Sequence, residues 1–336
     1  MTLFYRHIRL VLAAIGFLVL SGIAPAAAQT STLVNPNALA VKEQQLLKQH
    51  YFISGRGTLA DTKSDIIEQP LGRTWRLMTG VWMHWIGALV IVGVIALLAL
   101  AYFTIGPMMI ESGRSGRKIV RFTGFERFVH WLIVVAFVVL AVTGLNITFG
   151  RELLLPLIGA EAFFHWSLMA KYAHDYSSLP FVLGVAIMFA LWAKANIPTA
   201  LDFRWFKEGG GMVGHRHPPA EKFNGGQKAL FWCAMLGTAG VTISGLFLLF
   251  PFYWTNILGM QIAQVLHALI AIAYVALIIA HIYIGAVGME GGWEAMASGE
   301  VDLNWARQHH SLWVEREFAQ RLAASRPSSA ARAPKD

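Results

Sequence analysis

The chain has 336 residues, of which 56% are hydrophobic and only 14% are charged, far from the balance of a soluble domain. The stretch between Lys228 and Glu290 carries no charge, and a helix needs roughly 20 apolar residues to cross a bilayer, so this stretch has room for two membrane spans. The single cysteine, Cys233, excludes a disulfide framework, a thiolate-ligated iron–sulfur cluster and any C-x-x-C-H motif within this chain. The net charge of +8 does not indicate nucleic-acid binding, because the basic residues lie in loops beside apolar runs.

The N-terminus has the pattern of a secretory signal peptide, which we place at residues 1–28. Arg6 and Arg9 precede a short apolar run, and the small residues of Ala26–Ala28 suit cleavage. The alternative is an uncleaved anchor, and in either case the chain from Gln29 is translocated. Residues 29–80 are mixed and polar, so we expect a periplasmic extension there.

Five further apolar runs predict five membrane helices, with approximate limits Val81–Phe103, Phe128–Gly150, Leu179–Ala195, Ala229–Phe250 and Ile257–Met289. We therefore expect an all-α integral membrane protein, with an extra transmembrane helix at residues 81–110 before a four-helix domain at 111–318. The Ala-, Ser-, Pro- and Arg-rich end predicts a disordered cytoplasmic tail at 319–336.

The distribution of basic residues supports one orientation. With residue 29 outside, the three inner segments carry five, six and six Lys or Arg, whereas the outer loops carry Arg151 and Lys171 and then none. We expect a multi-pass protein of the bacterial inner (cytoplasmic) membrane, with a periplasmic extension and a cytoplasmic C-terminus. Arg151 to Ser178 is expected to be an outer loop.

Histidines inside membrane segments carry the chemistry, because an ionisable ring in hydrocarbon is costly unless it is paired or bound. His267 and His281 lie 14 residues apart in one uncharged helix, about 21 Å along its axis, and share a face. They reach opposite leaflets, so one metal cannot bind both. Two haems stacked across the membrane can, each taking its second axial ligand from another helix.

Depth in the membrane indicates which histidines are the partners of His267 and His281. His130 lies in the first turn of a span that starts on the inner side, near the depth of His281, and His174 lies at the outer side, near the depth of His267. Two imidazoles fill both axial positions of an iron, which suits electron transfer rather than oxygen chemistry. Any one of these histidines alone is more often a packing residue than a ligand. His165 competes with His174, and His84 also lies near the outer end of its span.

The remaining histidines lie in polar segments and need no metal to explain them: His50, His215, His217, His309 and His310. The adjacent last two are compatible with contact to a partner or a lipid head group.

Several segments together resemble the gamma, cytochrome b, subunit of respiratory formate dehydrogenase. They are R-F-V-H-W at 127–131, K-Y-A-H ending at His174, K-F-N-G-G-Q-K at 222–228, L-H-A and A-H-I-Y around His267 and His281, and G-E-V-D-L-N-W-A-R-Q-H-H at 299–310. The resemblance covers roughly residues 122–318 in consistent order. This sequence differs from shorter members of the family by its signal peptide, its extension and its extra span.

The resemblance implies two haem b groups in a four-helix core. His174 and His267 would hold the periplasmic-side haem and His130 and His281 the cytoplasmic-side haem, in agreement with the depth argument. Asn224 and Gln227 match the family's polar pocket for menaquinone or ubiquinone beside the inner haem. On the residues alone, these two amides can equally well cap the helix that follows them.

The resemblance also implies partners: an iron–sulfur beta subunit, a molybdenum- or tungsten-containing alpha subunit that oxidises formate, quinone and the lipid bilayer. Nothing in this chain could oxidise formate. An alternative within the class is the cytochrome b subunit of a nickel–iron hydrogenase or thiosulfate reductase. A different class is a haem-free membrane transporter or scaffold, in which the histidines relay protons or pack.

Overall fold

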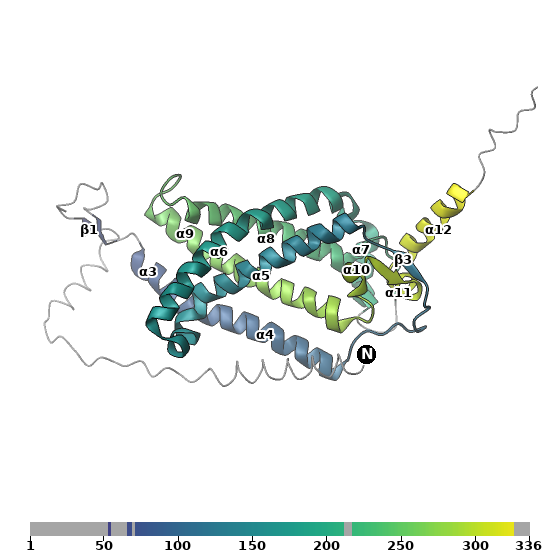
Figure 1. Ribbon diagram of the computed structural model, residues 1–336, viewed down its shortest axis with the longest axis horizontal. Helices are drawn as coiled ribbons and strands as arrows, with labels where there is room; N and C mark the ends of the chain where they lie inside the picture. The colour runs from purple at the N-terminus through teal and green to yellow at the C-terminus, as the bar shows by residue number, and fades with distance from the viewer. Residues whose placement is uncertain (1–52, 55–65, 69–70, 212–216, 326–336) are drawn as a thin grey trace, which may run out of the picture. The chain divides into compact units, whose positions relative to one another are not determined.

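The computed structural model describes residues 53–54, 66–68, 71–211 and 217–325 (Figure 1). Five of the described helices are long and apolar enough to cross a membrane: Gly72–Thr104, Gly124–Leu153, Ala160–Trp192, Gly225–Leu249 and Ile257–Gly288. The expected all-α membrane fold is confirmed, and the strands in the described residues are confined to two short pairs. The predicted signal peptide and most of the predicted extension lie outside the described residues.

The helices, in chain order, are α3 (Gly72–Leu77), a π-helical turn (Met78–Trp82), α4 (Met83–Thr104), α5 (Gly124–Leu153), α6 (Leu155–Trp192), α7 (Ala200–Lys207), α8 (Gly225–Leu249), α9 (Ile257–Tyr283), a second π-helical turn (Ile284–Gly288), α10 (Glu294–Ala297), α11 (Leu303–His309) and α12 (Ser311–Ser325). Short 3-10 turns follow α6 and α7 at Lys194–Asn196 and Gly209–Gly211. The strands are β1 (Ile53–Ser54) with β2 (Ile66–Glu68), and β3 (Lys118–Val120) with β4 (Glu300–Asp302), both pairs antiparallel.

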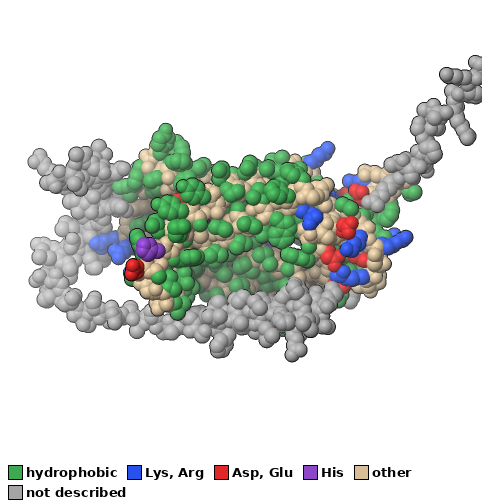
Figure 2. All heavy atoms as spheres, viewed as in Figure 1, with side chains coloured by type: hydrophobic (Ala, Val, Ile, Leu, Met, Phe, Trp, Pro, Cys, Tyr) green, Lys and Arg blue, Asp and Glu red, His purple; other side chains and the backbone are tan. Residues whose placement is uncertain are grey.

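The described residues form two compact units, each assembled from several stretches of chain. The first unit takes its helical part from residues 71–99, 141–175 and 239–276, and the second takes residues 100–140, 176–238 and 277–325. Each long helix contributes to both units. Hydrophobic side chains cover most of the helices in the face that Figure 2 shows, and most of the charged side chains visible there gather around β3, α10 and α11 of the second unit.

The extra helix begins earlier than expected. Helical structure starts at Gly72 and runs to Thr104, so the predicted boundary at residue 81 and the predicted helical end at 110 are both wrong. Trp75 and Thr79 belong to the helix, where the Thr79 hydroxyl donates to the carbonyl of Trp75 at 2.9 Å. Such a back-bond satisfies a polar side chain inside the helix itself, so a polar stretch can continue an apolar span.

Within the first unit, α4 packs closely against other helices at Gly87. A Cβ atom at this position would lie 3.0 Å from Cζ of Phe149 on α5 and 3.3 Å from Cδ1 of Ile272 on α9. Small residues of this kind let membrane helices approach one another closely. The extra helix is therefore part of the packed first unit.

Replacing Gly87 by leucine is expected to destabilise the protein by about 1–3 kcal/mol, because the side chain must displace Phe149 and Ile272 from a packed interface. Thermal unfolding of the purified protein in detergent measures the loss. Gly93 on the same helix has open space around it and supplies the matched control, since leucine there meets no atom within 4 Å of its Cβ. Equal melting temperatures for the two variants would contradict the packing.

The predicted outer loop from Arg151 to Ser178 is wrong, because most of it is helix. After a kink at Gly159, which has a φ of 79°, the helix runs without interruption from Ala160 to Trp192. Pro180 lies inside it, and membrane helices tolerate proline because neighbouring groups can satisfy the freed carbonyl. Scattered polar residues and this proline hide the helix from an apolar-run criterion. His165 and His174 therefore lie on a helix rather than in a loop.

Reciprocal side-chain caps start helices α5 and α7 in the second unit. Thr123 and Glu126 form a capping box at α5, with the Thr123 N–H donating to Oε2 of Glu126 at 2.8 Å and the Glu126 N–H donating to Oγ1 of Thr123 at 3.2 Å. Thr199 and Asp202 form a similar box at α7. These caps satisfy backbone donors that no helical carbonyl can reach.

A folded cap completes the second unit, where β3 pairs with β4 beside α11 (Figure 1). Its core is aromatic and includes Phe122, Trp192, Phe223, Trp305 and Trp313. Helix α12 continues to Ser325, so the predicted disordered tail is wrong for residues 319–325; the rest of it lies outside the described residues. The segment Ala-Gln-Arg-Leu-Ala-Ala is made of strong helix formers, which explains the difference.

Candidate functional site

The four histidines singled out by the sequence come together as two pairs. In the first unit, the ring centroids of His174 on α6 and His267 on α9 lie 6.2 Å apart with an interplanar angle of 63°. In the second unit, His130 on α5 and His281 on α9 lie 6.3 Å apart at 70°. These are the two pairs expected from depth in the membrane. Whether each pair holds a haem stays a prediction at this point.

The spacing within each pair suits one metal ion between the rings. Two imidazoles that bind a metal from opposite sides have centroids about 6 Å apart, because each metal–nitrogen bond is about 2 Å and each ring centre lies about 1 Å behind its nitrogen. Both separations agree with this value. No group of three or more His, Cys, Asp or Glu side chains in the described residues converges as a metal site. Each pair could therefore hold one metal ion through two imidazole nitrogens, the kind of donor set that a haem iron would take.

Hydroxyl groups orient the pair in the first unit. Oγ1 of Thr143 lies 2.8 Å from Nδ1 of His174, and Oγ of Ser244 lies 3.0 Å from Nδ1 of His267. The Ser244 hydroxyl donates its proton to the carbonyl of Gly240 at 2.7 Å, so it accepts from Nδ1–H of His267. Nε2 of His267 is then the nitrogen that keeps a lone pair, the form that binds a metal.

Each hydroxyl is followed by a glycine that leaves room for the ring. A Cβ at Gly144 would lie 3.6 Å from Cε1 of His174, and a Cβ at Gly245 would lie 3.3 Å from Cε1 of His267. Thr143–Gly144 on α5 and Ser244–Gly245 on α8 therefore have the same role. The hydroxyl residue hydrogen-bonds the imidazole, and the glycine lets the ring approach the helix backbone.

Replacing Ser244 by alanine is expected to weaken haem retention in the first unit about 10–100-fold, because it removes a hydroxyl that orients Nδ1 of His267. Transfer of haem to an excess of a haem-scavenging protein measures the change. Threonine at this position should restore wild-type retention. Thr148→Val is the matched control, since the Thr148 hydroxyl donates to the carbonyl of Gly144. Equal haem loss from Ser244→Ala and Thr148→Val would contradict the orienting role.

The pair in the second unit also suits a haem. Nδ1 of His130 is buried and has no hydrogen-bond partner among the described residues, so no protein group there orients this ring as the hydroxyls orient the first pair. Neutral imidazoles facing across about 6 Å are the donor set that haem iron takes in electron-transfer sites.

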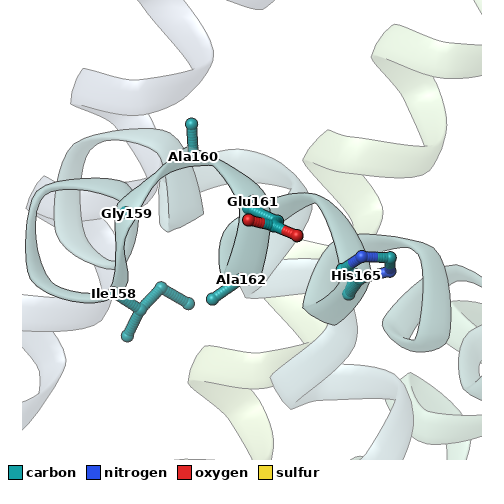
Figure 3. A pocket seen from close by; sticks show the side chains of 6 residues that line it. All are labelled: Ile158, Gly159, Ala160, Glu161, Ala162 and His165. Carbon is teal, nitrogen blue, oxygen red and sulfur yellow. The ribbon is translucent and has the colours of Figure 1, made fainter.

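His84 and His165 are placed elsewhere in the first unit. Nε2 of His84 lies 3.5 Å from Oε2 of Glu152, and its ring packs edge-on against Phe149. His165 lines an open depression of about 440 Å³ with Glu161 at the start of the uninterrupted part of α6 (Figure 3). Both histidines therefore have neighbours other than the His174–His267 pair.

Asn224 and Gln227 form a capping box at the start of α8. The Asn224 N–H donates to Oε1 of Gln227 at 3.2 Å, and the Gln227 N–H donates to Oδ1 of Asn224 at 3.0 Å. Both amide oxygens are thus used in starting the helix, the alternative that the residues alone had left open. A role in quinone binding would fall to their amide N–H₂ groups, which are donors.

Arg121 is a residue that sequence reasoning missed. Its guanidinium donates to the carbonyl of Lys222 at 2.6 Å and to Oε1 of Gln227 at 3.4 Å, so it supports the same capping box. It is only 4% exposed, and burial lowers its pKa to about 9. Nothing in the sequence distinguishes it from the other basic residues of its loop. Thr143 and Ser244 were also missed, although hydroxyls beside glycines in apolar spans are a usable signal.

A membrane-spanning helical bundle with two such histidine pairs has the construction of a membrane cytochrome b. The chain belongs to the prokaryotic cytochrome b561 family, whose model matches residues 121–299 and so includes both histidine pairs and the α8 cap. It is accordingly a multi-pass membrane protein that binds haem b. The matched region does not include the extra helix α4.

Three curated relatives are cytochrome b556 subunits of formate dehydrogenases. The chain is 29% identical to the cytochrome b556(fdo) subunit of Escherichia coli K12 over 199 residues, which cover 58% of this chain and 91% of that subunit. It is 27% identical to the nitrate-inducible cytochrome b556(Fdn) subunit of the same strain over 206 residues, 59% of this chain and 91% of that subunit. It is 27% identical to the subunit from Haemophilus influenzae over 214 residues, 61% of this chain and 86% of that subunit.

Proposed function

We propose that the chain is the cytochrome b subunit of a membrane-bound formate dehydrogenase, and that it transfers electrons from an iron–sulfur partner through two b haems to quinone. The observation that carries the proposal is the presence of two histidine pairs, each spaced for one metal ion. The relatives that match most of their length to this chain are formate dehydrogenase subunits. The catalytic partner, with molybdenum or tungsten, would oxidise formate outside this chain.

The chain's own residues would hold and orient the cofactors. His174 and His267 would hold the haem that receives electrons, and His130 and His281 the haem next to quinone. When bound, haem b supplies an iron that carries one electron reversibly. Ser244 and Thr143 fix the orientation of the His267 and His174 imidazole rings, and the apolar helices around both pairs exclude water. Residues 111–318 would form the di-haem domain, with α4 as an addition.

The basic segments support an orientation in the inner membrane. The loop that carries Arg114, Arg117, Lys118 and Arg121, and the cap that follows α9, would lie in the cytoplasm by the positive-inside tendency. Quinone, either menaquinone or ubiquinone, would then bind near Asn224 and Gln227 on that side. The outer ends of α6 and α9 would face the periplasmic iron–sulfur partner.

The test is a difference spectrum together with a choice of electron donor. Purified, haem-replete protein should show b-type bands after reduction by dithionite and contain about two haems per chain. The intact complex should reduce these haems with formate. Reduction by hydrogen, or oxidation of the haems by thiosulfate, would instead indicate the cytochrome b of a hydrogenase or a thiosulfate reductase. Absence of b-type bands would leave a haem-free transporter or scaffold.

A further inference from the structure

Three titratable side chains of the second unit form a row that leads inward from the surface. Glu111, whose side chain is 49% exposed, places Oε1 3.1 Å from Nε2 of His217. The ring of His217 meets the ring of His309 edge to face, with centroids 5.7 Å apart. His309 is buried, with 9% exposure. The row comes from three separate parts of the chain, and the proposed electron path uses none of its members.

Two deeper groups, Arg121 and His310, lie next to the end of this row. His310 follows His309 directly and is completely buried, and its Nδ1–H donates to the carbonyl of Glu221 at 2.8 Å. Nε2 of His310 is therefore an acceptor, and it has no partner among the described residues. Nη1 of Arg121 is a buried donor that likewise has no partner there.

The groups that carry the unpaired donor and the unpaired acceptor pack against the same two tryptophans, and the charge of Arg121 acts on His310. The Arg121 guanidinium lies 5.3 Å from the ring centroids of both Trp305 and Trp313, and the ring of His310 lies 5.4 Å and 6.5 Å from the same two rings. Leaving two such polar groups unsatisfied inside a protein costs free energy. A buried water that accepts from Nη1 and donates to Nε2 would satisfy both, which is the usual role of internal water.

We infer that Glu111, His217, His309 and a water held between Arg121 and His310 form a proton-entry route to the quinone site. The inference rests on the proposed function. Arg121 links the inner end of this route to quinone, since its Nη2 also donates to Oε1 of Gln227. Reduction of a quinone to a quinol takes two electrons, delivered by this chain's haems, and two protons, which form the two O–H bonds. The route supplies those protons from the aqueous side of the cap.

The charges around the row suit passage rather than storage of a proton. Burial, together with the nearby charges of His217 and Arg121, lowers the pKa of His309 to about 4, while Glu111 acts in the opposite direction. Burial and Arg121 also lower the pKa of His310 well below its usual range. At neutral pH both imidazoles are therefore neutral, so neither holds a proton between turnovers.

The water can be tested without turnover. Radiolytic labelling of the intact complex in ¹⁸O-water should place label on Trp305 or Trp313, which are 2% and 5% exposed, because a bound water lies against them. Trp192, buried to a similar degree at 8% exposure in the same core, is the internal control and should stay unlabelled. Absence of label at both Trp305 and Trp313 would overturn the water site.

The route is tested by reoxidation of formate-reduced haems on addition of quinone. Glu111→Gln, His217→Gln and His309→Gln should each slow reoxidation about tenfold at alkaline pH and increase its solvent deuterium isotope effect, while haem reduction keeps its wild-type rate. Imidazole buffer should restore the rate of haem reoxidation in the Glu111→Gln variant. Glu315→Gln, which removes an exposed carboxylate from the same cap, should behave as wild type.

The outcomes separate the route from the function. If quinone fails to reoxidise the haems of the wild-type complex, the proposed function fails. If quinone reoxidises the wild type and all three route variants keep the wild-type rate, pH profile and isotope effect, the proton route is wrong and the function stands.

Discussion

Replacing His267 by alanine should halve the haem content of the protein, from about two haems per chain to about one, because in our proposal each histidine pair holds a separate iron. His281 lies on the same helix in the other unit and should keep its haem. The pyridine haemochrome spectrum of purified protein measures the content. In the intact complex, formate should then reduce the remaining haem slowly, since the entry haem is missing.

The losses of haem caused by substitutions within one histidine pair should not be additive. His174→Ala should give the same loss as His267→Ala, and the double variant should lose no more than either, because the two rings lie together and in our proposal hold one haem. His267→Ala combined with His281→Ala should lose both haems. His165→Ala is the matched control, since this ring lines the depression in Figure 3 rather than facing a second histidine. If the His267→Ala variant kept two haems, another residue would be the ligand of the haem assigned to His267.

Substitution of Gln227 should separate quinone binding from helix capping, because one side chain serves both in our proposal. Gln227→Leu removes the acceptor for the Asn224 N–H and should destabilise the start of α8 by about 0.5–2 kcal/mol. Gln227→Glu keeps that acceptor, as in an ordinary capping box, and loses only the N–H₂ donor. Asn224→Asp is the corresponding cap-preserving change at the other residue.

If the amide donors hold quinone, Gln227→Glu and Asn224→Asp should keep the wild-type melting temperature and lower quinone affinity about tenfold, the effect of one hydrogen bond. Both haems should still be reduced by formate but reoxidised slowly at low quinone concentration. Wild-type reoxidation in both variants, with a stability loss only in Gln227→Leu, would make the pair a helix cap alone. The search for quinone would then move to the first unit.

The roles of the residues used in these tests could be predicted from the sequence to different extents. The histidine pairs followed from helical geometry, since positions 267 and 281 must share a face and the helix axis fixes their separation. Their partners followed from depth alone, because apolar runs and basic loops define where each span begins. The capping role of Asn224 and Gln227 was also visible as a possibility, because their spacing of three is that of a capping box.

The limits of the helices were less predictable. An apolar run marks the part of a helix that meets lipid, whereas helical hydrogen bonding continues as long as the backbone allows it. For this reason the predicted spans missed the first turns of α4 and the long outer part of α6. The predicted tail missed the end of α12 because its composition hid a run of strong helix formers.

The sequence by itself determined the class of this protein: a membrane bundle whose histidines lie at two depths, with haem as the group that suits them. Only the tertiary structure decided which hydroxyls orient His174 and His267, and that Arg121 is buried beside His310. The physical reason is the distance along the sequence over which each interaction acts. Periodicity and hydropathy act along one helix, whereas Thr143 meets His174 31 residues away and Ser244 meets His267 23 residues away, through helix rotations that local pattern does not specify.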